Sequence, residues 1–142
     1  TNLRAPFVLS QAFAAGLGEG LEGNIINLLD QRVKNLTPHF VSYTLSKSGL
    51  WTLTRTLALA LAPNIRVNAI APGPVLPSTR QNTAQFEAQA QATPLGRAVA
   101  PEEIAHGVLF LLAARSITGQ MISLDSGQHL HWSAPGPAPE TE

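Results

Sequence analysis

The sequence has no cysteine, and this absence removes two kinds of site. Neither a disulfide framework nor a cysteine metal site can form, so any redox chemistry must come from a cofactor. Charge is balanced, with nine basic and nine acidic side chains in 142 residues, which points to no polyanionic partner such as a nucleic acid. No apolar run reaches the roughly 18 residues that a membrane span needs.

Three further signals are missing from the sequence. The first residues, "TNLRAPFVLSQ", lack the basic-then-apolar order of a signal peptide, so the expected location is the cytoplasm. No G-x-S-x-G occurs, which excludes the nucleophile elbow of a serine hydrolase. His129 and His131 have the i, i+2 spacing of a strand, but without a third ligand nearby they predict no metal site.

What is present is a regular alternation of helical and strand-like segments. Helical periodicity covers 2–17, 40–62 and 101–113, with a weaker helical pattern over 78–96. Between these segments stand the short apolar runs "NIINLL", "IRVNAIA" and "QMISLD". Short apolar strands alternating with helices predict an α/β fold with an open sheet of parallel strands, covered by helices on both faces.

Three glycines spell the fingerprint of a dinucleotide site, but the elements around them stand in the wrong order. Gly18, Gly20 and Gly23 form G-x-G-x-x-G, which cradles a pyrophosphate only when a strand precedes it and a helix follows. Here a helical segment precedes the glycines and a strand follows them. We therefore predict a plain helix-to-strand connector at this place.

The segment "DQRVKNLTPHFVSYTLSK", residues 30–47, leads into a mainly apolar helix that carries a tyrosine and a lysine four residues apart. On a helical wheel, Tyr43 and Lys47 lie on the inward-facing stripe of this helix. A buried ammonium is costly unless it is paired. Lys47 therefore either snorkels to solvent beside a core tyrosine or has a specific anionic neighbour. The rest of the stripe consists of Leu50, Thr54, Leu57 and Leu61.

An anionic neighbour is available, because the strand before this helix ends at Asp30. Ligands bind at the carboxyl ends of strands in an open parallel sheet, so we expect Asp30, Tyr43 and Lys47 to converge on one edge. Lowering a tyrosine pKa from about 10 to near neutrality requires roughly 4 kcal/mol. One ammonium about 4 Å away supplies on the order of 4 kcal/mol at an effective dielectric constant of about 20. A single lysine is therefore sufficient to activate the phenol.

With Tyr-x-x-x-Lys at Tyr43 and Lys47, the sequence resembles the short-chain dehydrogenases/reductases. The resemblance covers nearly the whole chain in the family's order, through "NLRAPF", "GNIINLL", "IRVNAIAPGPV" and "ITGQMISLDSG". It implies a Rossmann-like doubly wound parallel sheet, with residues 1–128 as the C-terminal part of the domain and 129–142 as a C-terminal tail. The family's phosphate loop and first four strands have no counterpart here, so we expect the chain to be a piece of a longer protein.

One position departs from the general pattern of the family. A serine usually stands thirteen residues before the tyrosine, and this chain has Asp30 there. Pteridine reductases and dihydromonapterin reductases carry an aspartate at that place, and "IINLLD" with "YTLSK" is similar to them. An ionised aspartate only accepts hydrogen bonds and would raise the tyrosine pKa, in opposition to Lys47. We therefore expect Asp30 and Tyr43 to share a proton, which suits the basic nitrogen of a C=N bond better than a ketone.

The resemblance also implies roles for the site residues. Tyr43 would donate the proton, and Lys47 would lower its pKa and hold the ribose hydroxyls of the nicotinamide nucleotide. Asp30 would be the proton partner of the tyrosine, and Asn2 would anchor a water relay. The hydride itself belongs to the cofactor.

A proline-glycine-proline turn follows the second strand-like run. We expect the turn Pro72–Pro74 to shape the nicotinamide pocket, with Gly73 permitting close backbone approach and Val75 contributing its backbone. A plain turn is the alternative. In the variable segment that follows, Phe86 and Arg97 either contact substrate or serve as packing and surface residues.

The resemblance implies NADPH as the cofactor, with NADH left open because the residues that read the 2′-phosphate lie upstream of Thr1. The expected activity is reduction of a C=N bond in a pterin-like substrate. A carbonyl reductase, such as a 3-oxoacyl-acyl-carrier-protein reductase, and an inactive truncated fragment stay open as alternatives. The only charges in 40–62 are Lys47 and Arg55, which predicts a homodimer or homotetramer formed through this helix.

Overall fold

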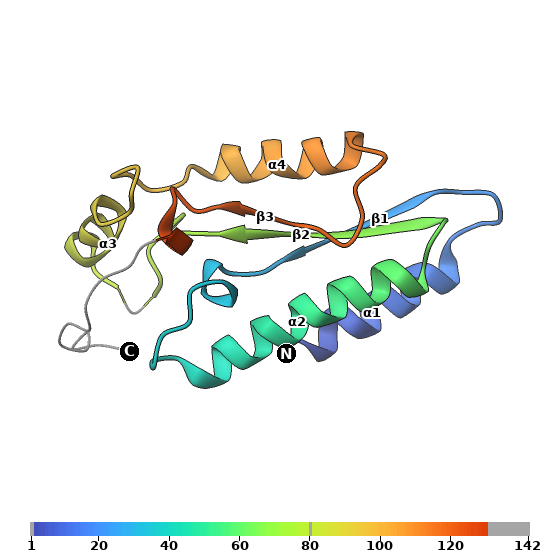
Figure 1. Cartoon of the computed structure of the whole chain (residues 1–142), viewed down its shortest axis with the longest axis horizontal. Helices are drawn as coiled ribbons and strands as arrows, with labels where there is room; N and C mark the ends of the chain where they lie inside the picture. The colour runs from blue at the N-terminus through green and yellow to red at the C-terminus, as the bar shows by residue number, and fades with distance from the viewer. Residues whose placement is uncertain (1, 80, 131–142) are drawn as a thin grey trace.

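The computed structural model describes residues 2–79 and 81–130. Three parallel strands form one sheet in the order β1-β2-β3, with α1 and α2 on one face and α4 on the other (Figure 1). The predicted α/β fold with parallel strands is confirmed. The elements are α1 (Arg4–Gly16), β1 (Gly23–Leu28), the 3₁₀ helix η1 (Gln31–Val33), α2 (Val41–Ala60), β2 (Ile65–Pro72), α3 (Thr83–Gln91), α4 (Pro101–Ala113), β3 (Met121–Leu124) and the 3₁₀ helix η2 (Gln128–Leu130).

The middle strand β2 forms the centre of the core. It pairs with β1 from Gly23↔Ile65 to Leu28↔Ile70, and with β3 from Ala69↔Met121 to Pro72↔Leu124. Helices cover both of its faces, so nearly every side chain of β2 is buried, which explains why its sequence is an apolar run and not an alternating one. Val67, Ala69, Ile70 and Ala71 have no exposed surface.

The helix α2 packs on β2 along the predicted stripe. Leu50, Thr54 and Leu57 are buried, and the stripe prediction is confirmed. The Thr54 hydroxyl donates to the Leu50 carbonyl at 2.8 Å and accepts a hydrogen bond from the Asn27 side-chain amide of β1 at 2.9 Å. Since buried polar groups need partners, this pair fixes α2 against β1 and so sets where the first turn of α2 meets the sheet.

The carboxyl ends of the three strands point to one edge of the sheet, and the segments that follow them gather there (Figure 1). We call this edge the rim. At the rim, α3 is shorter than the predicted 78–96, because a capping box between Asn82 and Gln85 starts the helix late. His129 and Leu130 of the predicted tail belong to η2, and the remainder of that tail lies outside the described residues.

The helices within residues 2–79 and 81–130 include none with the length and apolar character that crossing a membrane requires.

Candidate active site

Asp30 and Tyr43 meet at the rim. The strand β1 ends at Leu28, two residues before the predicted end at Asp30, because Asp30 is instead the N-cap of η1, where its Oδ1 accepts a hydrogen bond from the Arg32 backbone N–H at 2.8 Å. Tyr43 lies in the first turn of α2, and its hydroxyl donates to Asp30 Oδ2 at 3.0 Å. The structure therefore brings together two residues that are thirteen positions apart in sequence and that we expected to share a proton.

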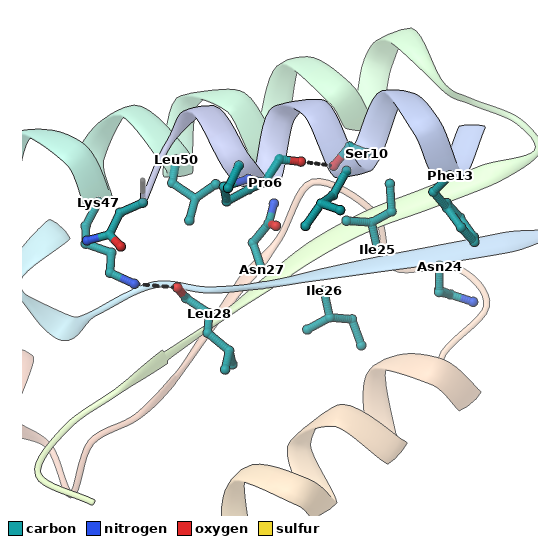
Figure 2. A pocket seen from close by; sticks show the side chains of 13 residues that line it. Pro6, Ser10, Phe13, Asn24, Ile25, Ile26, Asn27, Leu28, Lys47 and Leu50 are labelled. Carbon is teal, nitrogen blue, oxygen red and sulfur yellow. Dashed lines mark hydrogen bonds between the residues drawn. The ribbon is translucent and has the colours of Figure 1, made fainter. Parts of the chain in front are cut away.

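Lys47 lies one helical turn after Tyr43 and points to the same rim. Its Nζ donates to the Leu28 carbonyl at 2.8 Å and lies 5.7 Å from the centre of the Tyr43 ring (Figure 2). Burial lowers the pKa of Lys47, and the charge of Asp30 works against that change. The ammonium is thus partly desolvated and held beside the phenol, in the position that the Tyr-x-x-x-Lys spacing predicts.

Burial raises the pKa of Tyr43 well above 10, and the charge of Asp30 and its hydrogen bond raise it further. The positive charge of Arg32 lowers the Tyr43 pKa in part. An upward effect of Asp30 is what the sequence led us to expect. The phenol therefore keeps its proton at neutral pH, and a lowering of its pKa by Lys47 stays a prediction.

Asn2 lines a groove that runs along the outer edge of β1. The groove has a volume of about 540 Å³, and Lys47 also lines it (Figure 2). Its other lining is mainly apolar and comes from α1 and β1. Neither Asp30 nor Tyr43 lines the groove. The groove therefore follows the outer edge of β1, whose only partner among the described strands is β2, and does not include the Asp30–Tyr43 pair.

The turn Pro72–Pro74 lies at the rim, at the end of the strand next to β1. Gly73 donates its backbone N–H to the Leu124 carbonyl at 3.0 Å, and Pro74 is buried. Close approach of Gly73 to the nicotinamide stays a prediction, and within the described chain the close neighbour of Gly73 is Asp125. A methyl group at position 73 would lie 2.7 Å from Asp125 Cα. Val75, which follows the turn, is half-buried.

Other sequence motifs lie elsewhere. Gly23 is the first residue of β1, at the end of the sheet opposite the rim, so the glycine triplet is the predicted helix-to-strand connector. Arg97 forms an exposed ion pair with Glu103 at 2.8 Å. Phe86 lies half-buried in α3. Within residues 2–79 and 81–130, no cluster of three or more His, Asp or Glu side chains could hold a metal ion, and His131 lies outside those residues.

The sequence analysis missed Arg32. Its guanidinium lies 4.2 Å from the centre of the Phe40 ring and donates to the Thr37 hydroxyl at 3.2 Å. Phe40, the N-cap of α2, has a left-handed backbone with φ of 56°. The sequence does show a cation two residues after Asp30. Its effect on Tyr43, however, depends on how the chain folds back at Phe40.

The arrangement is a Rossmann-like α/β fold with Tyr-x-x-x-Lys and Asp30 at the rim of a parallel sheet. The chain belongs to the short-chain dehydrogenase/reductase superfamily, since a family model described as enoyl-(acyl carrier protein) reductase matches residues 1–129. Relatives and solved structures of the superfamily agree with this assignment.

Three of these similar proteins illustrate the range of the match. The structure of FolM alternative dihydrofolate reductase 1 from Brucella canis complexed with NADP has 52% identity and a TM-score of 0.92, and the match covers 96% of this chain and 55% of that one. L-xylulose reductase of Cavia porcellus is 35% identical over 89% of this chain and 55% of its own. The 3-oxoacyl-(acyl-carrier-protein) reductase FabG of Rickettsia conorii is 35% identical over 89% of this chain and 54% of its own. The chain thus spans about half the length of the curated relatives it matches.

Proposed function

We propose that the chain is the C-terminal part of an NADPH-dependent reductase that reduces a C=N bond of a pterin-like substrate. The observation that carries this proposal is the hydrogen bond from the Tyr43 hydroxyl to Asp30 Oδ2 at 3.0 Å. The identity with the FolM alternative dihydrofolate reductases, 52% and 54%, supports the pterin-like class, and both of those structures contain NADP.

The donor groups at the rim suit the nicotinamide end of NADPH. Lys47 Nζ uses one of its three protons on the Leu28 carbonyl, which leaves two for ribose hydroxyls. Pro72 and Pro74 have no backbone N–H, and Gly73 uses its own on the Leu124 carbonyl. The backbone N–H that follows the turn is therefore the one suited to the carboxamide, and it belongs to Val75, as expected from the sequence.

Proton transfer is the task of the chain's own side chains. NADPH, when bound, supplies the hydride. A proton shared between Asp30 and Tyr43 moves to the substrate nitrogen through the Tyr43 hydroxyl, and Asp30 accepts the replacement proton from solvent. Asn2, which lines the same groove as Lys47, anchors the water through which that proton arrives. The nitrogen of a C=N bond takes up a proton as hydride reaches the adjacent carbon, and the proton shared between Asp30 and Tyr43 supplies it.

Activity tests of the full-length gene product separate this function from its alternative. With a dihydropterin as substrate, Tyr43→Phe should reduce turnover by about a hundredfold or more, and Asp30→Ser by at least about tenfold. His106→Ala, an exposed position on α4 outside the site and the outer face of α2, is the control and should retain activity. If Asp30→Ser leaves dihydropterin turnover unchanged, the proposal is wrong.

The second candidate is a carbonyl reductase, which the 3-oxoacyl-(acyl-carrier-protein) and L-xylulose reductases among the relatives favour. A serine at position 30 would donate a hydrogen bond to a substrate carbonyl, which an ionised Asp30 cannot do. Under this candidate, Asp30→Ser should increase turnover of an acetoacetyl thioester. The same substitution therefore has opposite effects under the two candidates.

A third possibility is that these 142 residues alone are inactive. The edge of β1 has no strand partner in the described chain, and the glycine triplet lies at the wrong end of the sheet for a phosphate site. NADPH titration should therefore give much weaker binding to the 142 residues than to a longer gene product. Equal, tight binding by both would contradict the proposal that the site needs further residues.

The outer face of α2 supports a homo-oligomer as the working form. Val41, Leu45 and Leu59 are 61%, 67% and 84% exposed, and they lie on a helix with few charges. Exposed apolar side chains on one helix face favour an interface, and symmetric pairing of two copies of α2 would cover them. Light scattering on the full-length gene product should give the mass of a dimer or tetramer, and a monomeric mass would contradict this.

A further inference from the structure

The turn after β3 is built around a buried carboxylate. Asp125 is 3% exposed, and its Oδ1 accepts a hydrogen bond from the Gly127 backbone N–H at 3.1 Å. Its Oδ2 accepts from the His129 backbone N–H at 2.7 Å and lies 2.8 Å from His129 Nδ1. Because an ionised carboxylate only accepts hydrogen bonds, the Nδ1 of His129 carries the proton in this contact. The His129 imidazole thus joins the end of the turn to the carboxylate at its start.

The backbone of this turn needs such support. Ser126 has φ of 54° and Gly127 has φ of 81°, so two successive residues are in the left-handed region. A residue with a side chain adopts this region at a cost of roughly 1–2 kcal/mol. The hydrogen bonds that Asp125 accepts from Gly127 and His129, both beyond Ser126, hold the chain in this conformation.

The turn after β3 also fixes the turn Pro72–Pro74, which we expect to shape the nicotinamide pocket. The Asp125 backbone lies so close to Gly73 that a methyl group at position 73 would be 2.7 Å from Asp125 Cα and 2.9 Å from its carbonyl oxygen. Gly73 also donates its backbone N–H to the Leu124 carbonyl at 3.0 Å. A contact this tight leaves no room for independent movement, so a displacement of Asp125 displaces Gly73.

Two other rim segments are attached to the same turn. The Leu95 backbone N–H, beyond α3, donates to the Ser126 carbonyl at 3.1 Å. The Asn35 side chain, beyond η1, donates to the Gln128 carbonyl at 3.3 Å. The residues that follow β3 therefore connect the segment after η1, the turn Pro72–Pro74 and the segment after α3.

We propose that His129 is a positioning residue for the reductase site: its Nδ1–H, held by Asp125, locks the turn after β3 and thereby the backbone of Pro72–Pro74. Its consequence for NADPH binding rests on the proposed function. The locking of Gly73 does not rest on the proposed function, because it follows from contacts within the chain. His129 is not expected to touch the reacting atoms, so its effect is on cofactor affinity more than on turnover.

The test compares His129→Ala with His129→Asn in the full-length gene product. An asparagine amide can donate to Asp125 from nearly the position of the imidazole Nδ1, whereas alanine cannot. His129→Ala should weaken NADPH binding by about tenfold, the equivalent of one hydrogen bond to a charged group, with a smaller change in kcat. His129→Asn should restore affinity to within about threefold of wild type. His106→Ala, on the exposed surface of α4, is the control and should change neither.

Nuclear magnetic resonance of glycine-labelled protein tests the locking itself without any activity. The Gly73 amide resonance should move in His129→Ala and stay in place in His129→Asn. The Gly16 resonance, on α1, should not move in either variant. If His129→Ala fails to fold, His129→Gln takes its place. The glutamine amide lies one methylene farther from the backbone than the imidazole Nδ1, so it does not reproduce the bond to Asp125. An unmoved Gly73 resonance in the alanine or glutamine variant overturns the proposal.

The two assays also separate failure of this inference from failure of the proposed function. If the wild type binds no NADPH, the proposed function is wrong, and the Gly73 resonance still decides whether His129 positions the turn. If His129→Ala lowers the melting temperature while NADPH affinity and the Gly73 resonance stay as in wild type, His129 has a structural role only and the inference is wrong.

Discussion

The contact between Asp30 and Tyr43 makes a prediction that can be worked out from one distance. Asp30→Asn keeps the size of the side chain and an oxygen that can accept the Tyr43 hydroxyl, but removes the negative charge. With 3.0 Å between the two oxygens, repulsion between a carboxylate and a phenolate is about 1.4 kcal/mol in water and about 5.5 kcal/mol at an effective dielectric constant of about 20. The acid dissociation constant of Tyr43 should therefore increase by at least about tenfold.

The sequence makes this measurement unusually direct. Tyr43 is the only tyrosine among the 142 residues, so ultraviolet absorbance of tyrosinate against pH reports this side chain alone. In a longer gene product, subtraction of the Tyr43→Phe titration isolates it. Circular dichroism at each pH establishes that the variant is still folded where its tyrosine ionises.

The matched control is Glu22→Gln, which also removes one carboxylate. Glu22 directly precedes β1, whose six residues separate it from the rim by roughly 20 Å. That distance is about twice the Debye length at 0.1 M salt, so the control should leave the Tyr43 titration unchanged. If Asp30→Asn shifts the titration no more than Glu22→Gln does, the two side chains are not in contact in solution and the shared proton has no basis.

Two predictions concern stability and use pairs of like residues. Gly73→Ala should lower the free energy of unfolding by about 1–3 kcal/mol, because the added methyl group meets backbone at 2.7 Å, whereas Gly16→Ala, with nothing within 4 Å, should leave it equal or raise it by up to about 1 kcal/mol. Urea denaturation measures both, and equal effects would contradict the close contact. Thr54→Val should cost about 1–3 kcal/mol because it leaves the buried amide of Asn27 without its acceptor. Thr56→Val removes only an exposed bond to the Thr52 carbonyl and should stay within about 0.5 kcal/mol in thermal or urea unfolding, so a similar loss in both would refute this account.

Much of the fold and the first members of the site could be read from the sequence, because their signals are local. The apolar stripe of α2 repeats with the period of a helix, and it predicted that Tyr43 and Lys47 face the sheet. The run of β2 is apolar throughout because helices cover both of its faces, which predicted a parallel sheet. Asp30 was found because it closely follows a strand-like run, and the carboxyl ends of parallel strands meet at the rim.

The remaining features depend on contacts between distant parts of the chain. Nothing in "DQR" says that Arg32 lies against Phe40 and lowers the Tyr43 pKa, because that requires the left-handed turn at Phe40. Similarly, the sequence indicated a reason for Gly73 in the nicotinamide pocket, and the structure adds the backbone of Asp125 as a second reason.

The sequence by itself therefore determined the order of helices and strands, the inward face of α2 and the choice of Asp30 and Tyr43 as residues that meet at the rim, because periodicity and strand ends are properties of neighbouring residues. Only the tertiary structure decided that Tyr43 is 3.0 Å from Asp30, that its pKa is raised, and that His129 closes a turn against Gly73. Distances and desolvation are set by packing between segments far apart in the chain, which no local pattern encodes.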